Sequence, residues 1–214
     1  MPSRDGLLVV LSGPAGSGKS SLVENLIATN PGKARRAITA TTRPPRPGEV
    51  NGVDYYFLSQ EEFQRMIDDG QFLEYTEFNK NLYGTPRHSL ETDIAKGGVV
   101  ILVIEVDGAE SIKFFFPEAI FIFIIPPTPG ELRKRLEKRG TESREDIENR
   151  LAIARQEMQR ISEYDFLIIN DNFDTATHDL AAVIRAVDRS LIFGNELEHW
   201  EMGEFANWNT RQFL

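Results

Sequence analysis

Four short runs of apolar residues recur along the chain, and each has the length of a β-strand. The segments between them carry apolar residues at the three- and four-residue spacing of helices that bury one face. A continuous apolar run, rather than an alternating one, is typical of a strand buried on both faces of a parallel sheet. Such strands, alternating with helices, predict an α/β fold in which helices cover both faces of a parallel sheet through right-handed crossovers. The four runs are residues 7–12, 99–105, 120–125 and 166–169.

Capping residues mark where the helices begin. Ser59 and Glu62 have the spacing of a capping box, and Thr85 followed by Pro86 predicts an N-cap and the first residue of a helix. Residues 128–131 combine an N-cap threonine, a proline and a capping-box glutamate. The predicted helices cover residues 21–29, 59–69, 85–96, 107–115, 128–139, 143–158, and a last stretch from about 175 past 191.

The middle of the chain departs from this pattern. Residues 37–43 favour a strand, and the proline-rich segment 44–55 excludes regular structure. Residues 72–78 alternate between apolar and polar, and residues 81–84 can pair back with them. We therefore expect a small, mainly antiparallel sheet inserted into the α/β protein. The predicted organisation is a core of residues 1–36 and 97–192, an inserted region of residues 37–96, and a C-terminal extension of residues 193–214 that has no clear period and no assigned role.

Composition narrows the class of protein. The formal net charge of −9 argues against general binding to nucleic acid or to an anionic membrane surface. The sequence has no cysteine, which excludes disulfides and thiol chemistry. No apolar run approaches the roughly 20 residues of a membrane-spanning helix, and the N-terminus lacks the apolar core of a signal peptide. These features predict a soluble protein of the cytoplasm, and a homo-oligomer is compatible with them.

The first apolar run leads into a loop suited to phosphates. Residues 13–20 read G-P-A-G-S-G-K-S, which fits the spacing G-x-x-x-x-G-K-[ST]. Glycines let successive backbone N–H groups point at one anion at the positive end of the following helix. Lys19 would bring a positive charge to the β- and γ-phosphates, and Ser20 a hydroxyl ligand for Mg²⁺. The predicted ATP-binding residues here are Gly13, Pro14, Ala15, Gly16, Ser17, Gly18, Lys19, Ser20 and Ser21.

A phosphate loop alone is compatible with many reactions. A kinase that acts on a nucleotide phosphate needs three more features: a second anion site, a cover that carries arginines, and a carboxylate near the metal. The candidates are Arg43 and Arg46 for the anion site, Arg135, Arg139 and Arg150 for the cover, and Glu105 for the carboxylate.

At this point the sequence resembles a known family. Residues 41–55 read T-T-R-P-P-R-P-G-E-V-N-G-V-D-Y, which is similar to the signature T-T-R-x-P-R-x-G-E-x-x-G-x-D-Y of guanylate kinases. Residues 139–142 and the pair Arg150-Leu151 resemble the lid of that family, which here would cover residues of about 131–150. The resemblance runs from about residue 7 to 184. It implies a P-loop kinase that transfers the γ-phosphoryl group of ATP to GMP or dGMP, with Mg²⁺.

The resemblance also implies roles for single residues. Glu74 would recognise guanine, because a carboxylate can accept hydrogen bonds from both the N1–H and the 2-amino group. Asn170 would lie near adenine, and Glu105 would contact GMP and, through water, the metal. Lys19, Arg43, Arg135, Arg139 and Arg150 would act in catalysis. The implied GMP-binding residues are Thr39, Arg43, Arg46, Tyr55, Glu74, Tyr83, Thr85 and Glu105.

The chain departs from the family at one strand end. Where the family reads D-x-D-x-Q-G, Val103 replaces the first aspartate and Glu105 the second. Two other functions stay open at this stage. A kinase of a phosphorylated sugar would keep the phosphate loop but lose the guanine-reading carboxylate. A non-catalytic guanylate-kinase-like module that binds proteins would be expected to have a degraded phosphate loop.

Overall fold

The computed structural model describes residues 6–78, 80–138 and 144–199, with the side chains of residue 78 and of residues 188–199 left out. Its centre is a five-stranded parallel sheet with the strand order β2-β7-β1-β8-β9. Four of these strands are the predicted apolar runs, so the parallel α/β fold is confirmed. The strands are β1 (Leu7–Ser12), β2 (Ala34–Arg36), β7 (Val99–Val103), β8 (Ile120–Ile125) and β9 (Phe166–Ile169).

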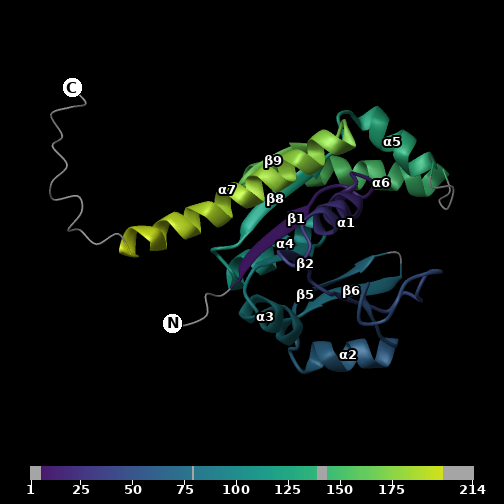
Figure 1. The fold of residues 1–214 in the computed structure, drawn as a ribbon. Coiled ribbons are helices and arrows are strands. Elements are labelled where there is room, and N and C mark those ends of the chain that lie inside the picture. Colours follow the sequence, from purple (N-terminus) through teal and green to yellow (C-terminus); the bar gives the residue numbers. More distant parts are fainter. Residues whose placement is uncertain (1–5, 79, 139–143, 200–214) are drawn as a thin grey trace, which may run out of the picture.

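Helices cover both faces of this sheet (Figure 1). Alternate residues of β1 point to opposite faces, as the two-residue period of a strand requires. Val9 and Leu11 pack with α1 (Lys19–Thr29) and α7 (Phe173–His199), whereas Leu8 and Val10 pack with α3 (Arg87–Ala95) and α4 (Val106–Phe115). The apolar runs are therefore continuous because each strand has a core on either side.

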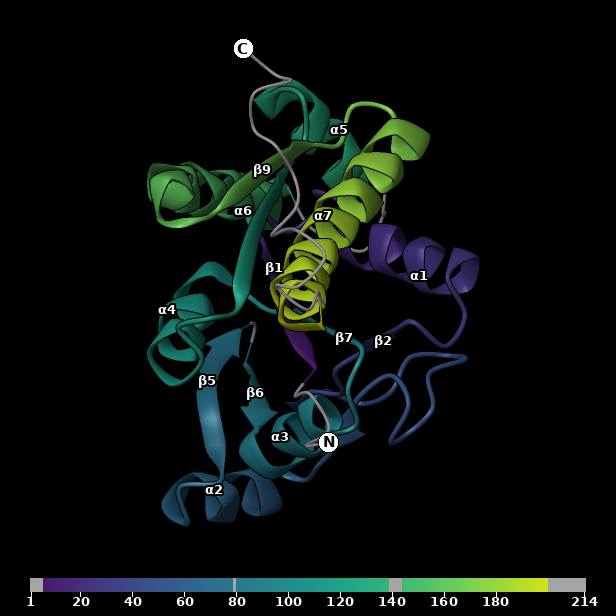
Figure 2. The same cartoon turned by 60° about the vertical axis from the view of Figure 1, so that its left-hand side comes forward.

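A second sheet is built from residues 40–86 and lies beside the carboxyl end of the first (Figures 1 and 2). Its order is β4-β3-β6-β5, with two antiparallel pairings and one parallel pairing. Phe63 of the helix α2 stacks on Phe72 in a small core of its own. The elements are β3 (Ala40–Thr41), β4 (Tyr56–Phe57), α2 (Gln60–Asp68), β5 (Phe72–Phe78) and β6 (Asn81–Pro86).

Two further helices, α5 (Pro129–Lys138) and α6 (Arg144–Glu157), pack against each other. The 3₁₀ turn η1 (Met158–Glu163) follows α6. The Thr128 hydroxyl accepts a hydrogen bond from the backbone N–H of Glu131 at 3.1 Å, as predicted for an N-cap. The Glu131 carboxylate instead accepts a bond from Arg135, one turn along. The predicted start of the next helix, at residue 143, lies outside the described residues.

Two sequence predictions of local structure are wrong. Thr85 and Pro86 belong to β6, and α3 begins only at Arg87, because the Thr85 hydroxyl is used in the site described below. Of the predicted strand 37–43, only Ala40–Thr41 forms a strand, and it belongs to the second sheet. The strand β2, which precedes it in the chain and belongs to the core sheet, was not predicted. The last helix runs to His199, in agreement with the prediction that it extends past residue 191. Within the part of the chain that the structure describes, no helix is both long and apolar enough to cross a membrane.

Candidate active site

A cavity of about 750 Å³, here called the cleft, lies between the phosphate loop, the second sheet and the end of β7. Its position outside the carboxyl ends of the parallel strands is where α/β sheets commonly bind ligands. Most of the predicted site residues line it. The lining residues are Ala15, Gly16, Gly18, Lys19, Ser20, Ser21, Thr39, Arg43, Arg46, Tyr55, Glu74, Thr76, Tyr83, Gly84, Val103, Ile104, Glu105 and Arg150.

The phosphate loop occupies one wall of the cleft and ends at the N-terminus of α1. Gly13 and Gly18 have positive φ angles of 131° and 96°, in a region that L side chains rarely adopt. A Cβ at Gly13 would lie 2.1 Å from the carbonyl oxygen of Ile124, so a side chain does not fit there. The Lys19 ammonium donates to the carbonyl oxygens of Gly13 and, at 3.2 Å, of Pro14. The loop therefore holds the Lys19 ammonium against its own backbone.

The Asn170 side chain binds the backbone of this loop. It follows β9 and is buried, and its Nδ2 donates to the carbonyl oxygen of Ser17 at 2.8 Å. Arg135 of α5 donates in turn to the Asn170 carbonyl oxygen at 2.9 Å and to Glu131 at 3.0 Å. Neither Asn170 nor Arg135 lines the cleft. Their observed contacts connect the phosphate loop to α5.

Arginines and tyrosines form the opposite wall. Both terminal nitrogens of Arg43 donate to the Glu49 carboxylate at 2.9 Å, and this hydrogen-bonded ion pair raises the pKa of Arg43 and lowers that of Glu49. The guanidinium also lies over the Tyr55 ring, 5.5 Å from its centroid, and the Tyr55 and Tyr83 rings meet edge to face. Arg46 lines the cleft beside them. This wall concentrates positive charge in a protein whose net charge is negative.

Glu74 is the buried carboxylate at the base of the cleft, with 9% of its surface exposed. The Thr85 hydroxyl, on the neighbouring strand, donates to its Oε1 at 2.5 Å. Burial is the main cause that raises the pKa of Glu74 to about 7; the Thr85 hydrogen bond opposes this shift, and the negative charge of Glu105 adds to it. One carboxylate oxygen is therefore fixed in place while the cleft remains open to a ligand.

These features agree with comparisons to known proteins. The guanylate kinase family model matches residues 5–187. The chain belongs to the guanylate kinase family. It is 47% identical over 186 residues to a guanylate kinase of Desulfitobacterium hafniense, covering 87% of this chain and 92% of that protein. It is 42% identical over 181 residues to a guanylate kinase of Clostridioides difficile, covering 85% of this chain and 88% of that protein.

Solved structures lead to the same family. A guanylate kinase from Anaplasma phagocytophilum superposes with a TM-score of 0.69 at 32% identity, covering 87% of this chain and 88% of that one. A gluconokinase from Sinorhizobium meliloti superposes with a TM-score of 0.50 at 15% identity, covering 90% of this chain and 98% of that one. The second likeness shows a shared fold alone.

The remaining predicted site residues of this guanylate kinase family member are placed as follows. Glu105 is exposed at the N-cap position of α4, and Val103 ends β7 two residues earlier, so both departures from the family pattern lie in the cleft. Gly13, Pro14 and Ser17 belong to the loop but do not line the cleft, and neither does Thr85; Arg139 lies outside the described residues.

Sequence reasoning missed residues that the fold brings to the cleft. Thr76 follows Glu74 by two positions on β5 and so faces the same way, a signal that strand alternation provided. Glu157 of α6 lines a smaller neighbouring cavity of about 300 Å³ with Glu105 and Arg150. Burial, with the nearby charges of Glu105 and Asp107, raises the pKa of Glu157 to about 7, while Lys19 opposes this shift. No sequence pattern indicated this carboxyl group.

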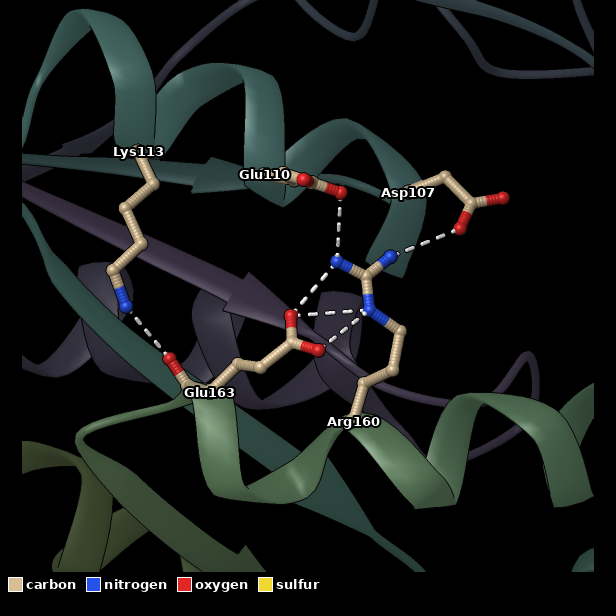
Figure 3. Close-up of polar contacts among 5 residues, drawn as sticks. All are labelled: Asp107, Glu110, Lys113, Arg160 and Glu163. Atoms are coloured by element: carbon tan, nitrogen blue, oxygen red, sulfur yellow. Dashed lines mark hydrogen bonds and ion pairs between the residues drawn. The ribbon is translucent and has the colours of Figure 1, made fainter.

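Arg160 connects η1 to the start of α4 (Figure 3). Its guanidinium donates to Asp107 at 3.2 Å, to Glu110 at 3.1 Å and to Glu163 at 2.7 Å, and these carboxylates, Glu163 above all, raise its pKa. Lys113 adds a bond to the Glu163 carbonyl oxygen at 2.8 Å. The network joins the turn after α6 to the helix that contacts Glu74.

That contact is made by Gly108 of α4. A Cβ at this position would lie 2.7 Å from Glu74 Oε2 and 3.0 Å from its carboxyl carbon. Gly108→Ala should therefore displace the carboxylate, although alanine itself favours a helix. We expect the KM for GMP to rise at least about tenfold while the KM for ATP changes less than about twofold, as measured by steady-state kinetics.

Gly130→Ala is the matched control for this substitution. Gly130 is also helical, and a Cβ there would meet only Thr128 Oγ1, at 3.8 Å. Its KM for GMP should be unchanged. A Gly108→Ala variant with the KM of the unaltered protein would contradict the positioning of Glu74 by α4.

Proposed function

We propose that this protein transfers the γ-phosphoryl group of ATP to the phosphate of GMP or dGMP, giving ADP and GDP or dGDP. The observation that carries the choice of acceptor is Glu74, a buried carboxylate that faces the same cleft as the phosphate loop. Its two carboxylate oxygens, one of which accepts from the Thr85 hydroxyl, can accept from the N1–H and 2-amino groups of guanine. A buried site built for those donors rejects bases that lack them.

The two walls of the cleft suit two different phosphate groups. Backbone N–H groups of the loop, Lys19 and the N-terminus of α1 would hold the phosphates of ATP. Arg43, Arg46, Tyr55 and Tyr83 would hold the phosphate of GMP, and Thr39 would lie beside them. In this arrangement a GMP phosphate oxygen attacks the γ-phosphorus, the bond from that phosphorus to the β–γ bridging oxygen breaks, and ADP leaves. The residues act by positioning and by stabilising charge.

The arginines of α5 and α6 would complete the charge stabilisation. Arg150 lines the cleft together with residues of the phosphate loop, where it can approach the phosphoryl group in transit. We assign Arg135 and Arg139 to the same cover on the resemblance, and Asn170 to the ATP side. In the structure Arg135 is bonded to Glu131 and to the Asn170 backbone, so its part would be to hold the cover to the loop.

The residues present fit Mg²⁺. Ser20, exposed at the N-terminus of α1, and Glu105, across the cleft, offer the hard oxygen atoms that this ion prefers. A single direct protein oxygen, that of Ser20, would leave most of an octahedral shell to ATP phosphates and water, which is usual for this ion. When bound, Mg²⁺ would neutralise charge on the β- and γ-phosphates. Ser20 would ligate it directly and Glu105 through water.

A screen of acceptors tests the proposed function. With ATP and Mg²⁺, the release of ADP should be measured with GMP, dGMP, AMP, CMP and UMP. The expected result is that GMP and dGMP exceed the other three by at least about 10³-fold in kcat/KM. Equal rates with all five nucleotides would contradict the assignment of guanine to Glu74. ATP binding without turnover would favour a non-catalytic module, although the intact phosphate loop argues against one.

A further inference from the structure

Arg36 lies next to the proposed acceptor-phosphate wall but was not among the site residues predicted from the sequence. It ends β2, the edge strand of the core sheet, at the carboxyl end where the cleft opens. Its guanidinium carbon is 5.7 Å from the centroid of the Tyr55 ring, and that of Arg43 is 5.5 Å from the same centroid. One tyrosine ring therefore contacts two guanidinium groups, one from the end of β2 and one from the loop after β3.

The neighbouring residue Arg35 makes different contacts. Arg35 points to the opposite face of β2, where it donates to the carbonyl oxygens of Asp93 and Gly97 and ties the strand to the end of α3. Arg36 points to the face on which Ala34 packs near α1. Among the described residues, no carboxylate or carbonyl group pairs with the Arg36 side chain, and Tyr55 is its observed contact. Its charge is therefore not neutralised by the fold.

The local charge balance favours an anion at this place. Arg36, Arg43 and Arg46 lie on or beside Tyr55, and Glu49 neutralises Arg43. Two guanidinium groups over one ring repel each other, and both are attracted to the electron-rich face of the ring. A dianionic phosphate held by the Tyr55 wall would relieve this repulsion. Arg36 itself does not line the cleft, so its effect would pass through the position of Tyr55 and through its electric field.

We propose that Arg36 is a positioning residue of the acceptor-phosphate site, which holds the Tyr55 ring from the core sheet and adds a third positive charge to the field at the GMP phosphate. This inference rests on the proposed function, because it takes the Tyr55 wall as the place of the acceptor phosphate. It predicts that Arg36 contributes to binding of the phosphate and not of the base.

Guanosine, which lacks the phosphate, separates these two contributions. Affinities of the full chain for GMP and for guanosine should be measured by titration calorimetry, together with kcat and the KM for GMP. Arg36→Met should weaken GMP binding about three- to tenfold, as expected for one charge removed several ångströms from a phosphate. The affinity for guanosine and kcat should each change less than about twofold. Arg36→Lys keeps the charge and should restore most of the affinity for GMP.

Two further variants serve as controls for this experiment. Arg65→Met removes an equal charge from the exposed face of α2 and should leave both affinities unchanged. Arg36→Gln, a second neutral variant, repeats the test should the methionine variant fail to fold, and thermal melts check both. The difference between Arg36→Met and the unaltered protein should shrink at high salt, because salt screens the lost attraction.

Unchanged GMP affinity in a folded neutral variant would overturn the proposal, and so would an equal loss for GMP and guanosine, which indicates a structural role. Failure of the proposed function has a different signature. In that case the unaltered protein itself would bind GMP no better than AMP, before any variant is compared.

Discussion

Glu74→Gln is expected to lower kcat/KM for GMP by about 10³-fold and, at about pH 8, to make the folded protein more stable. The glutamine oxygen can still accept from Thr85, but its amide nitrogen would present a donor to the donors of guanine. Loss of two charge-assisted hydrogen bonds, each contributing about 1.5–3 kcal/mol, accounts for a change of this size. Steady-state kinetics with GMP as the varied substrate would measure it.

The gain in stability follows from the raised pKa of Glu74. Its pKa is about 7 in the folded protein, against the ordinary value of 4.5. The folded state therefore binds this proton more tightly than the unfolded state, and stability falls as the pH rises from about 4.5 to 7. Above that range the full cost of the buried charge is present, about 3 kcal/mol for a shift of this size. Glu74→Gln removes the penalty at about pH 8 and has little to remove at about pH 5.

Thermal melts at these two pH values would test the prediction. A rise of roughly 5–10 °C is expected at the higher pH, since each kcal/mol shifts the midpoint by about 2–4 °C in a chain of this size. Glu61→Gln, at an exposed position of α2, is the control and should melt like the unaltered protein. A lower midpoint for Glu74→Gln at the higher pH would contradict the claim that the buried negative charge of Glu74 destabilises the folded protein.

The same pKa predicts how GMP binding depends on pH. Only the ionised carboxylate accepts from both guanine donors, so the affinity should fall about tenfold per pH unit below about pH 7. Guanosine isolates this effect from the titration of the GMP phosphate. An affinity for guanosine that stays constant between about pH 5 and 8 would show that Glu74 does not titrate there.

Lys19→Met is expected to lower kcat by about 10²- to 10³-fold, with little effect on the affinity for GMP. Its ammonium already lies at the mouth of the phosphate loop, held by the carbonyl oxygens of Gly13 and Pro14. When ATP binds, phosphate oxygens would replace these carbonyl groups as its partners. A neutral methionine of similar length removes the charge that stabilises the phosphoryl group in transit.

Lys33→Met provides the matched loss of charge, because Lys33 is exposed after the end of α1 and away from the cleft. Its kcat should equal that of the unaltered protein. The GMP affinity of Lys19→Met, measured by calorimetry, should also be unchanged, since Lys19 belongs to the opposite wall. A kcat within about fivefold of the original would contradict the assignment of Lys19 to the transferred phosphate.

The sequence predicted the parts of the fold and the site that depend on local patterns. Continuous apolar runs identified four strands of the core sheet, and the spacing of residues 13–20 identified the phosphate loop. Glu74 and Tyr83 were found through the family resemblance, and both line the cleft. Strand pairing brings Glu74 opposite Thr85, so the hydroxyl expected to cap a helix holds the carboxylate instead.

The features that the sequence missed depend on tertiary contact. β2 consists of Ala34, Arg35 and Arg36, and its strand character comes from pairing with β7 rather than from its residues. Gly108 looks like an ordinary helical glycine until α4 packs on β5 and leaves no room for a Cβ beside Glu74. Arg36 ends β2 of the core sheet and Tyr55 directly precedes β4 of the second sheet, so only the folded chain brings them together.

The most direct test of the central claim follows the γ-phosphoryl group itself. ATP labelled in the γ-phosphate should be incubated with the protein, Mg²⁺ and equal amounts of GMP and AMP, and the labelled products separated. We expect the label in the β-phosphate of GDP, and labelled ADP from AMP should form at least about 10³-fold more slowly. Release of the label as inorganic phosphate, or its transfer to both nucleotides at similar rates, would contradict the account.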